Sequence, residues 1–129
     1  MELKIKQILL ENTESLFGVV IDEKVIQFQK TRKEYEGDLT LVIFPFVKML
    51  KRSPAEVGEK VGAFLVENID DIASFNVVGG FLNLVISADY WLSKLKEMDK
   101  DNQYGYSEAD SKPTIMVEYS SPNTNKPLH

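Results

Sequence analysis

The feature that most constrains the fold of this chain is a pair of glycines set between two apolar runs. Gly79 and Gly80 separate Phe-Asn-Val-Val at residues 75–78 from Phe-Leu-Asn-Leu-Val-Ile at residues 81–86. Two glycines between short β-prone runs are typical of a two-residue hairpin turn, because primed turns need backbone angles that glycine adopts without strain. The sequence therefore predicts an antiparallel β-hairpin here.

The start of one helix is marked just as clearly. The run Ser-Pro-Ala-Glu at residues 53–56 offers a capping serine, a proline at the first helical position and a glutamate that completes a capping box. Apolar residues follow at helical spacing, and the helix is expected to end near Asn68. Its apolar face consists of Val57, Val61, Phe64 and Leu65.

A further helix is predicted after the hairpin. Ser87 is placed to cap it, and Asp89 lies in its first turn. Large apolar residues then recur along it, and we expect them to form its buried stripe. These residues are Trp91, Leu92, Leu95 and Met98.

The N-terminal residues predict a helix and a strand. Residues 2–11 have helical spacing of apolar side chains, and Asn12-Thr13 is expected to be a break or a new cap. Residues 25–29 alternate apolar and polar side chains, which predicts a half-buried strand.

Residues 39–52 complete the order of elements. Their first half is β-like, and a helix is expected to begin near Pro45, because proline fits neither a central strand nor the middle of a helix. The order helix, strand, strand, helix, helix, hairpin, helix predicts an α+β fold. We expect an antiparallel sheet with helices packed on one face.

Composition restricts the classes of function. The chain has no cysteine, which excludes disulfides, thiolate metal sites and a cysteine nucleophile. A net charge of −5 argues against a uniformly basic nucleic-acid binder but allows a local basic patch. His129 is the only histidine, so catalysis by two histidines of this chain is excluded. Neither a membrane span nor a signal peptide is recognisable, and a cytoplasmic location without a membrane partner is expected.

The C-terminal residues are expected to begin a second domain. Residues 1–99 form the predicted first domain, and residues 100–112, polar and punctuated by Gly and Pro, predict a linker. Residues 113–129 contain a predicted strand at 114–120 and then a polar loop, which is where open α/β sheets place ligand-binding groups. The alternative is a surface loop whose Ser, Pro and Asn residues only form turns.

This loop carries a specific motif. Glu-Tyr-Ser-Ser-Pro-Asn at residues 118–123 is followed by Lys126 and His129. The segment resembles the start of the ATP-binding signature of class I aminoacyl-tRNA synthetases, specifically the arginyl-tRNA synthetases, in which a lysine leads to His-x-Gly-His. The sequence stops on the first histidine of that motif. The resemblance implies that residues 113–129 are the first strand and signature loop of a truncated Rossmann-type catalytic domain.

The resemblance also implies roles for individual residues. Glu118, Ser121 and Asn123 are expected to bind arginine. Lys126 and His129 are expected to bind ATP and to be the catalytic residues, because they would stabilise the phosphates as charge develops on them. ATP would enter as a substrate together with Mg²⁺, and neither a protein-held metal nor a tightly bound cofactor is implied.

For the full-length protein, the resemblance implies an arginine–tRNA ligase that is a monomer and has arginine, ATP and tRNA(Arg) as partners. The present chain is expected to be inactive alone, because it lacks most of the nucleotide-binding fold. Two alternatives remain at this point: a stand-alone RNA- or protein-binding module, or another class I-type adenylating ligase, such as a pantothenate-type enzyme.

The first hundred residues show the same resemblance. The family carries an N-terminal α+β domain that contacts the outer corner of tRNA around the D-loop, with Gly-Asp before a helix and a Gly-Phe-Ile-Asn-like strand. Here these segments are Gly37-Asp38 and Gly-Phe-Leu-Asn at residues 80–83. Taken singly, the first is an ordinary turn and the second a hairpin with a core phenylalanine.

One departure from the family pattern affects how tRNA would be bound. Residues 39–45 lack the amide side chains that many members carry after Gly-Asp. We therefore expect tRNA binding to depend on shape, phosphate contacts and stacking. Two basic clusters near turns or helix ends are candidates for phosphate contacts, and a solvated surface is the alternative for each. The clusters are Lys30, Arg32 and Lys33, and Lys48, Lys51 and Arg52.

Overall fold

The computed structural model of the protein describes residues 1–105 and 116–117. In this part of the chain, no helix is long and apolar enough to cross a membrane. The helices are α1 (Glu2–Phe17), the short 3₁₀ helix η1 (Glu23–Val25), α2 (Phe44–Leu50), α3 (Pro54–Asn68) and α4 (Ala88–Lys100). The strands are β1 (Gln27–Lys30), β2 (Leu39–Val42), β3 (Ile72–Val78) and β4 (Phe81–Ile86).

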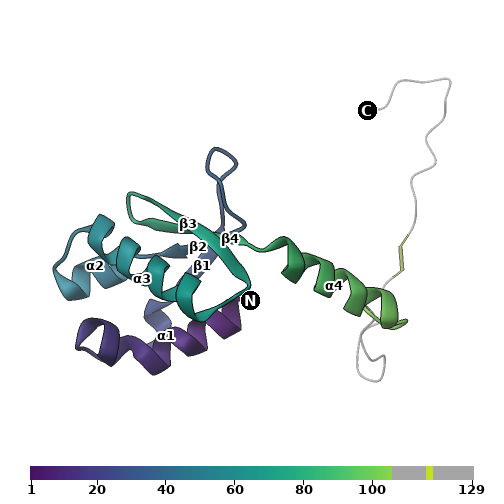
Figure 1. Ribbon diagram of the computed structural model, residues 1–129, viewed down its shortest axis with the longest axis horizontal. Coiled ribbons are helices and arrows are strands. Elements are labelled where there is room, and N and C mark those ends of the chain that lie inside the picture. Colours follow the sequence, from purple (N-terminus) through teal and green to yellow (C-terminus); the bar gives the residue numbers. More distant parts are fainter. Residues whose placement is uncertain (106–115, 118–129) are drawn as a thin grey trace.

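The four strands form one antiparallel sheet in the order β1-β2-β4-β3 (Figure 1). The predicted hairpin is confirmed: Val78 pairs with Phe81 across a two-residue turn. Gly79 has a φ of 57° and Gly80 has a negative φ, the pattern of a type II′ turn. The α+β fold with an antiparallel sheet is therefore confirmed.

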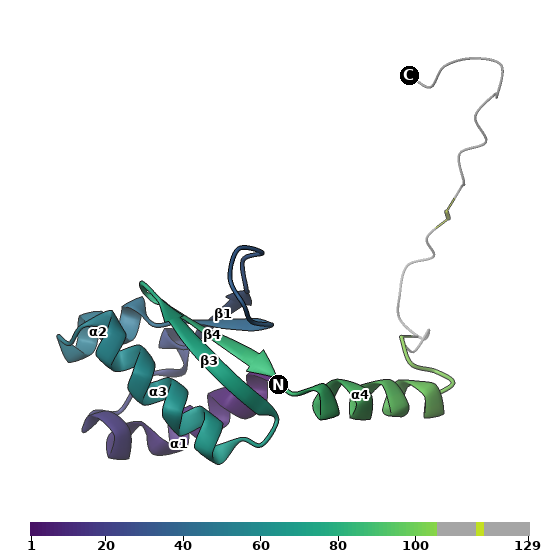
Figure 2. The same cartoon turned by 45° about the horizontal axis from the view of Figure 1, so that its top comes forward.

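The hydrophobic core lies between one face of the sheet and the helices α1, α2 and α3 (Figure 2). Phe46 of α2 is the largest fully buried side chain. Leu9 of α1 and Leu65 of α3 are also fully buried, as are Leu41 and Leu82 in the two central strands. One layer of helices on one sheet face is the arrangement that the order of elements predicted.

Helix α3 packs most closely on the sheet. The predicted capping box is present, with the Ser53 hydroxyl accepting from the Glu56 amide at 3.3 Å and the Glu56 carboxylate accepting from the Ser53 amide at 3.4 Å. A Cβ atom at Gly62 would lie 2.3 Å from the ring of Phe75 in β3. A glycine at this position therefore allows the helix backbone to contact the strand directly.

The structure corrects the predicted ends of two N-terminal elements. Helix α1 does not break at Asn12-Thr13, because the Asn12 amide donates to the Ile8 carbonyl at 2.8 Å and the Thr13 hydroxyl donates to the Leu10 carbonyl at 3.3 Å. These side chains bond within the helix instead of capping a new one. Strand β1 begins two residues later than predicted, because Glu23–Val25 forms η1.

The predicted buried stripe of the last helix is wrong. The Ser87 cap is present, with its hydroxyl accepting from the Tyr90 amide at 3.3 Å, and α4 forms as expected. However, α4 projects away from the domain (Figures 1 and 2), and none of its residues is buried. Tyr90 alone packs partly against the core. The helical spacing of the apolar residues was identified correctly, but residues 1–105 provide no surface that buries them.

The C-terminal predictions fall almost entirely outside the described residues. Of the predicted strand at 114–120, only Met116 and Val117 are described, and both are exposed. The Rossmann-type strand, the linker at 100–112 and the domain boundary at 99 therefore stay predictions.

Candidate nucleic-acid interface

The sheet face opposite the helices is the candidate site. In antiparallel strands, directly paired residues share a face and neighbouring residues alternate between faces. Leu41 and Leu82 pair on the core side, so the pair Thr40–Asn83 and the side chain of Phe81 lie on the opposite side, here called the outer face. The helices α1, α2 and α3 pack on the other face, although Phe44 at the start of α2 reaches the ring of Phe81.

A ladder of polar side chains crosses the outer face. The Thr40 hydroxyl donates to the Asn83 carbonyl oxygen at 2.6 Å, and the Asn83 amide donates to Asn76 Oδ1 at 2.9 Å. The Asn76 amide donates to the Glu36 backbone carbonyl at 2.6 Å. Thr31 and Thr40 hydroxyls lie 2.9 Å apart, and Thr31 must be the donor because the single Thr40 proton is already used. The ladder ties the loop of residues 31–38 to three strands.

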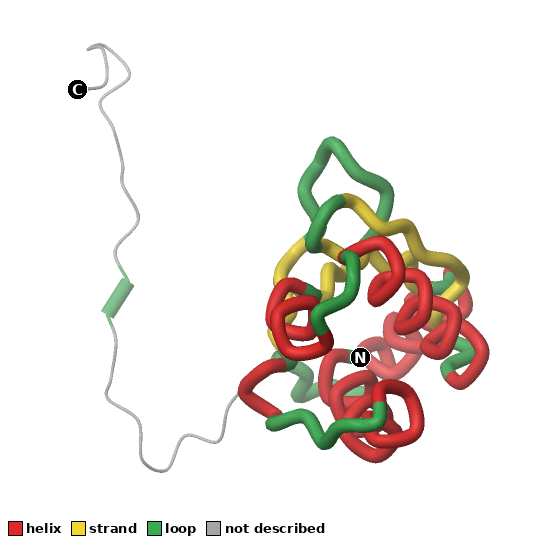
Figure 3. The backbone as a smooth tube through the Cα atoms, turned by 90° about the vertical axis from the view of Figure 1, so that its left-hand side faces the viewer, coloured by secondary structure: helices red, strands yellow, loops and turns green. Residues whose placement is uncertain are grey.

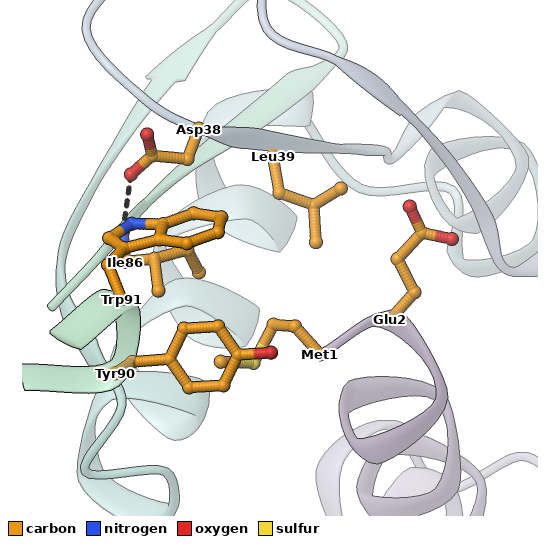
Figure 4. A pocket seen from close by; sticks show the side chains of 7 residues that line it. All are labelled: Met1, Glu2, Asp38, Leu39, Ile86, Tyr90 and Trp91. Atoms are coloured by element: carbon orange, nitrogen blue, oxygen red, sulfur yellow. Dashed lines mark hydrogen bonds between the residues drawn. The ribbon is translucent and has the colours of Figure 1, made fainter. Parts of the chain in front are cut away.

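Gly37-Asp38 fixes the other end of that loop. Gly37 has a φ of 146°, and a Cβ there would lie 3.2 Å from the Asn83 side chain and 3.3 Å from the Leu84 carbonyl. The Asp38 amide donates to the Leu84 carbonyl at 2.8 Å, and the Asp38 carboxylate accepts from the Ile86 amide at 2.8 Å (Figure 4). The pair thus precedes strand β2, not a helix, and attaches the loop to β4.

The loop of residues 31–38 rises from the sheet at the end of β1 (Figure 3). It places a cationic side chain next to an aromatic ring. The Arg32 guanidinium lies 5.6 Å from the centre of the Phe81 ring. Phe81 is half-buried on the outer face and meets the Phe44 ring edge-on at 5.5 Å, so it does not belong to the core, as the alternative interpretation of this segment had it. Tyr35 is 40% exposed beside this pair. The hollow between them has a volume of only about 10 Å³ and is lined by Gln29, Arg32, Tyr35, Thr40, Phe81 and Asn83.

This arrangement suits an extended polar partner better than an enclosed small molecule. A hollow of about 10 Å³ holds no substrate. An aromatic ring and a guanidinium at a surface are groups that bind unstacked nucleotides, and the exposed Gln29 adds an amide beside them. Among the described residues, no group of three or more His, Cys, Asp and Glu side chains is arranged to hold a metal.

The two predicted basic clusters take different positions. Lys30 ends β1 and pairs with Leu39 on the helix side of the sheet, whereas Arg32 and Lys33 begin the loop, and Arg32 lies at the rim of the outer face. Lys48 and Lys51 lie at the end of α2 with Arg52 after them, and all are exposed. Within the described residues, no hydrogen bond, ion pair or cation–π contact joins the second cluster to the first. Contact of either cluster with tRNA stays a prediction.

Sequence reasoning missed the outer-face partners Gln29, Tyr35 and Thr40. The signal that could have identified Thr40 is its place in an apolar run, because a polar residue buried there needs a hydrogen-bonding partner. The amide side chains of the outer face come from other strands, in Gln29, Asn76 and Asn83, and those of Asn76 and Asn83 are used within the ladder. Their contributions depend on pairings between segments distant in sequence, which no local pattern reveals.

The residues predicted to bind arginine and ATP lie outside the described residues. They are Glu118, Ser121, Asn123, Lys126 and His129.

Comparison with known proteins decides the family. A sequence profile described as "Arginyl tRNA synthetase N terminal domain" matches residues 3–86. The chain belongs to the arginyl-tRNA synthetase family. The match confirms the resemblance found in the sequence and disfavours another class I-type adenylating ligase.

Curated relatives agree with the arginyl-tRNA synthetase assignment. The arginine–tRNA ligase of Bacteroides thetaiotaomicron is 46% identical over 122 residues, which cover 94% of this chain and 20% of the relative. That of Flavobacterium psychrophilum is 47% identical over 125 residues, covering 88% and 20%. That of Phocaeicola vulgatus is 43% identical over 130 residues, covering 99% and 22%. The chain thus spans about one fifth of the length of these relatives.

A solved structure supports the fold of this arginyl-tRNA synthetase domain. The arginyl-tRNA synthetase of Thermus thermophilus matches with a TM-score of 0.61 and 17% identity, over 73% of this chain and 15% of that one. Both family segments of the first hundred residues, Gly37-Asp38 and residues 80–83, meet at the outer face. The resemblance and the structure therefore point to the same surface.

Proposed function

We propose that this chain is the N-terminal part of an arginine–tRNA ligase and that the outer face of its sheet binds tRNA. The observation that carries the proposal is the half-buried Phe81 ring beneath the Arg32 guanidinium, on the sheet face opposite the helix layer. A nucleobase can stack on such a ring, and the guanidinium can stack on the base or bind a phosphate. Stacking on aromatic side chains is how proteins hold unstacked bases.

The polar ladder makes this surface suitable for binding. It fixes the loop of residues 31–38 through buried hydrogen bonds among Thr31, Thr40, Asn83 and Asn76. A loop held in place before binding loses little conformational entropy when tRNA arrives. Exposed bases occur in RNA loops and not in helices, so a tRNA loop is the expected contact, in agreement with the D-loop contact of the family.

Single cations are available at the same surface. The chain as a whole carries a net charge of −5, which repels a polyanion. Arg32 and Lys33 begin the loop at the rim of the outer face, and Glu34 and Glu36 follow them, so phosphate contacts there would come from placed side chains and not from a net positive charge. Phosphate contacts from such side chains orient the RNA, while stacking on Phe81 holds a base.

The full-length protein would catalyse a two-step reaction in the cytoplasm, as a monomer. The arginine carboxylate attacks the α-phosphate of ATP, which forms arginyl-adenylate and releases pyrophosphate. A terminal ribose hydroxyl of tRNA(Arg) then attacks the arginyl carbonyl and releases AMP. In this proposal Glu118, Ser121 and Asn123 bind arginine, while Lys126 and His129 stabilise the ATP phosphates. Mg²⁺ would enter only with ATP.

The proposal is tested by aminoacylation kinetics on the full-length enzyme. Phe81→Leu keeps apolar volume but removes the ring. It should raise the KM for tRNA roughly 5- to 150-fold, since stacking of a base on an aromatic side chain is worth about 1–3 kcal/mol. The KM values for arginine and ATP should change less than about twofold.

Two controls accompany this measurement. Phe81→Tyr keeps an aromatic ring and should retain a near wild-type KM for tRNA. The chain of residues 1–129 should attach no arginine to tRNA, because it lacks most of the nucleotide-binding fold. A folded Phe81→Leu enzyme with an unchanged KM for tRNA would contradict binding at the outer face, and a full-length protein without arginine-dependent activity would contradict the proposed ligase.

A further inference from the structure

One face of α4 is apolar, and the described residues bury none of it. The exposed fractions of its large side chains are 48% for Trp91, 53% for Leu92, 60% for Leu95 and 39% for Met98. Contiguous apolar surface of this kind on a soluble protein marks a contact with another surface.

This face continues into two hollows. A groove of about 650 Å³ runs along α4 as far as Tyr104. A second hollow of about 380 Å³ opens at the base of the helix, beside Met1 and Leu39 (Figure 4). Tyr90 and Trp91 line both hollows, so they form one continuous surface that can receive side chains of a partner.

The charges of α4 argue against RNA and membrane partners for this face. The helix carries equal numbers of acidic and basic residues, so it offers no net attraction to a polyanion or to an anionic lipid surface. These residues are Asp89, Glu97 and Asp99, and Lys94, Lys96 and Lys100. An apolar face with balanced charges around it is typical of a contact with folded protein.

The length of the relatives indicates which folded protein packs on the apolar face of α4. The chain covers only 20% of the Bacteroides thetaiotaomicron ligase, so about four fifths of such a polypeptide lies outside it. Helix α4 is the last described helix, so in a polypeptide that begins with this N-terminal domain the remaining part would follow it in the chain. A covalently tethered partner has a high effective concentration and needs little intrinsic affinity.

We propose that the apolar face of α4 is an interface within the full-length polypeptide, on which the part that follows residue 129 packs. The inference rests on the proposed function, because the catalytic part of the ligase is the occupant. Packing there fixes the outer face of the sheet relative to the site of arginine transfer. The single helix would otherwise leave the two parts free to rotate against each other.

Hydrogen exchange of the α4 backbone amides tests the proposal. In the full-length protein, these amides should exchange at least about tenfold more slowly than in the chain of residues 1–129, because the covered helix opens less often. Equal exchange in the two proteins overturns the proposal. Slow exchange already present in the short chain also overturns it. If that protection increases with concentration, the occupant is a second copy; if it does not, the occupant is the chain's own C-terminal segment.

A pair of variants locates the interface. Leu95→Asp places a charge on the apolar face and should return the α4 amides of the full-length protein to the fast exchange of the short chain. Ser93→Asp places the same charge on the opposite side of the helix and should leave the protection unchanged. Equal effects of the two variants would contradict an interface on the apolar face.

Exchange and activity separate this proposal from the proposed function. If the α4 amides of the full-length protein are protected but the protein has no arginine-dependent activity, the interface is supported. The assignment of the occupant as the catalytic part of a ligase is then contradicted. If the full-length protein attaches arginine to tRNA but its α4 amides exchange rapidly, the proposed ligase function is supported and the proposed interface is contradicted.

Discussion

Helices α3 and α4 have the same local design and opposite environments. Each begins after a serine whose hydroxyl accepts from the amide three residues on, at 3.3 Å in both cases. Each has an acidic residue in its first turn, Glu56 or Asp89, and a row of apolar side chains. Yet α3 buries five of its residues and α4 buries none.

The difference shows which property local sequence controls. Capping and helical spacing specify that a helix forms, because these interactions lie within the helix itself. Whether an apolar face is buried depends on a partner elsewhere in the chain. Gly58 and Gly62 let α3 lie directly on β3, whereas α4 leaves the end of β4 and runs outward. A helix whose row of large apolar side chains is left exposed by the described residues of its domain indicates an interface with another part of the polypeptide.

The largest effect is expected from truncating a leucine in each of the two helices. Leu65 is fully buried, so Leu65→Ala should lower the free energy of unfolding of the 1–129 chain by about 2–5 kcal/mol. Leu95 is 60% exposed, and Leu95→Ala should change it by less than about 0.5 kcal/mol. Urea unfolding measures both. Similar losses for the two variants would mean that α4 belongs to the core of the domain.

A smaller effect is expected from the two caps. Ser53→Ala removes the capping box of a helix in the core and should cost about 1 kcal/mol of global stability. Ser87→Ala should shorten α4 locally, because that helix can fray without unfolding the domain. Urea unfolding should therefore detect Ser53→Ala only, while hydrogen exchange in the first turn of α4 should detect Ser87→Ala. A global loss of about 1 kcal/mol for both would show that α4 unfolds with the domain.

The smallest expected effect concerns an ion pair on α4. Lys94 Nζ lies 2.8 Å from the Glu97 carboxylate, and the hydrogen bond and charge of Glu97 raise the pKa of Lys94 above its ordinary value of 10.5. The pair therefore stabilises α4 fully below pH 10.5, and this contribution is lost as pH rises through the raised pKa.

An NMR titration of the 1–129 chain checks this prediction. Glu97→Gln should move the pKa of Lys94 down towards its ordinary value. Asp99→Asn removes the same charge from the same helix without touching Lys94 and should leave that pKa in place. An unchanged pKa in Glu97→Gln would show that the pair does not persist in solution.

Local signals predicted much of the fold, and long-range contacts explain what they missed. The glycine pair at 79–80 and the capping serines act within a few residues, so their hairpin and helices were predicted correctly. Asn12 and Thr13 misled because the same side chains can cap a helix or bond within it. At the candidate site, Arg32 was predicted as a cation, but its position over Phe81 depends on a sheet register that joins distant segments. The site predicted at residues 118–129 stays a prediction.

The polar ladder across the outer face has a consequence for folding fidelity as well. Because side chains alternate along a strand, a slip of β2 by one residue against β4 would turn Leu41 outward and Thr40 into the core. The slip would also take the Thr40 hydroxyl away from Asn83 Oδ1, and a buried acceptor left without its donor costs about 1–3 kcal/mol. The hydrogen bond between Thr40 and Asn83 therefore disfavours the shifted pairing of β2 with β4. The hydrogen bonds that hold the loop of residues 31–38 also favour a single register of the sheet.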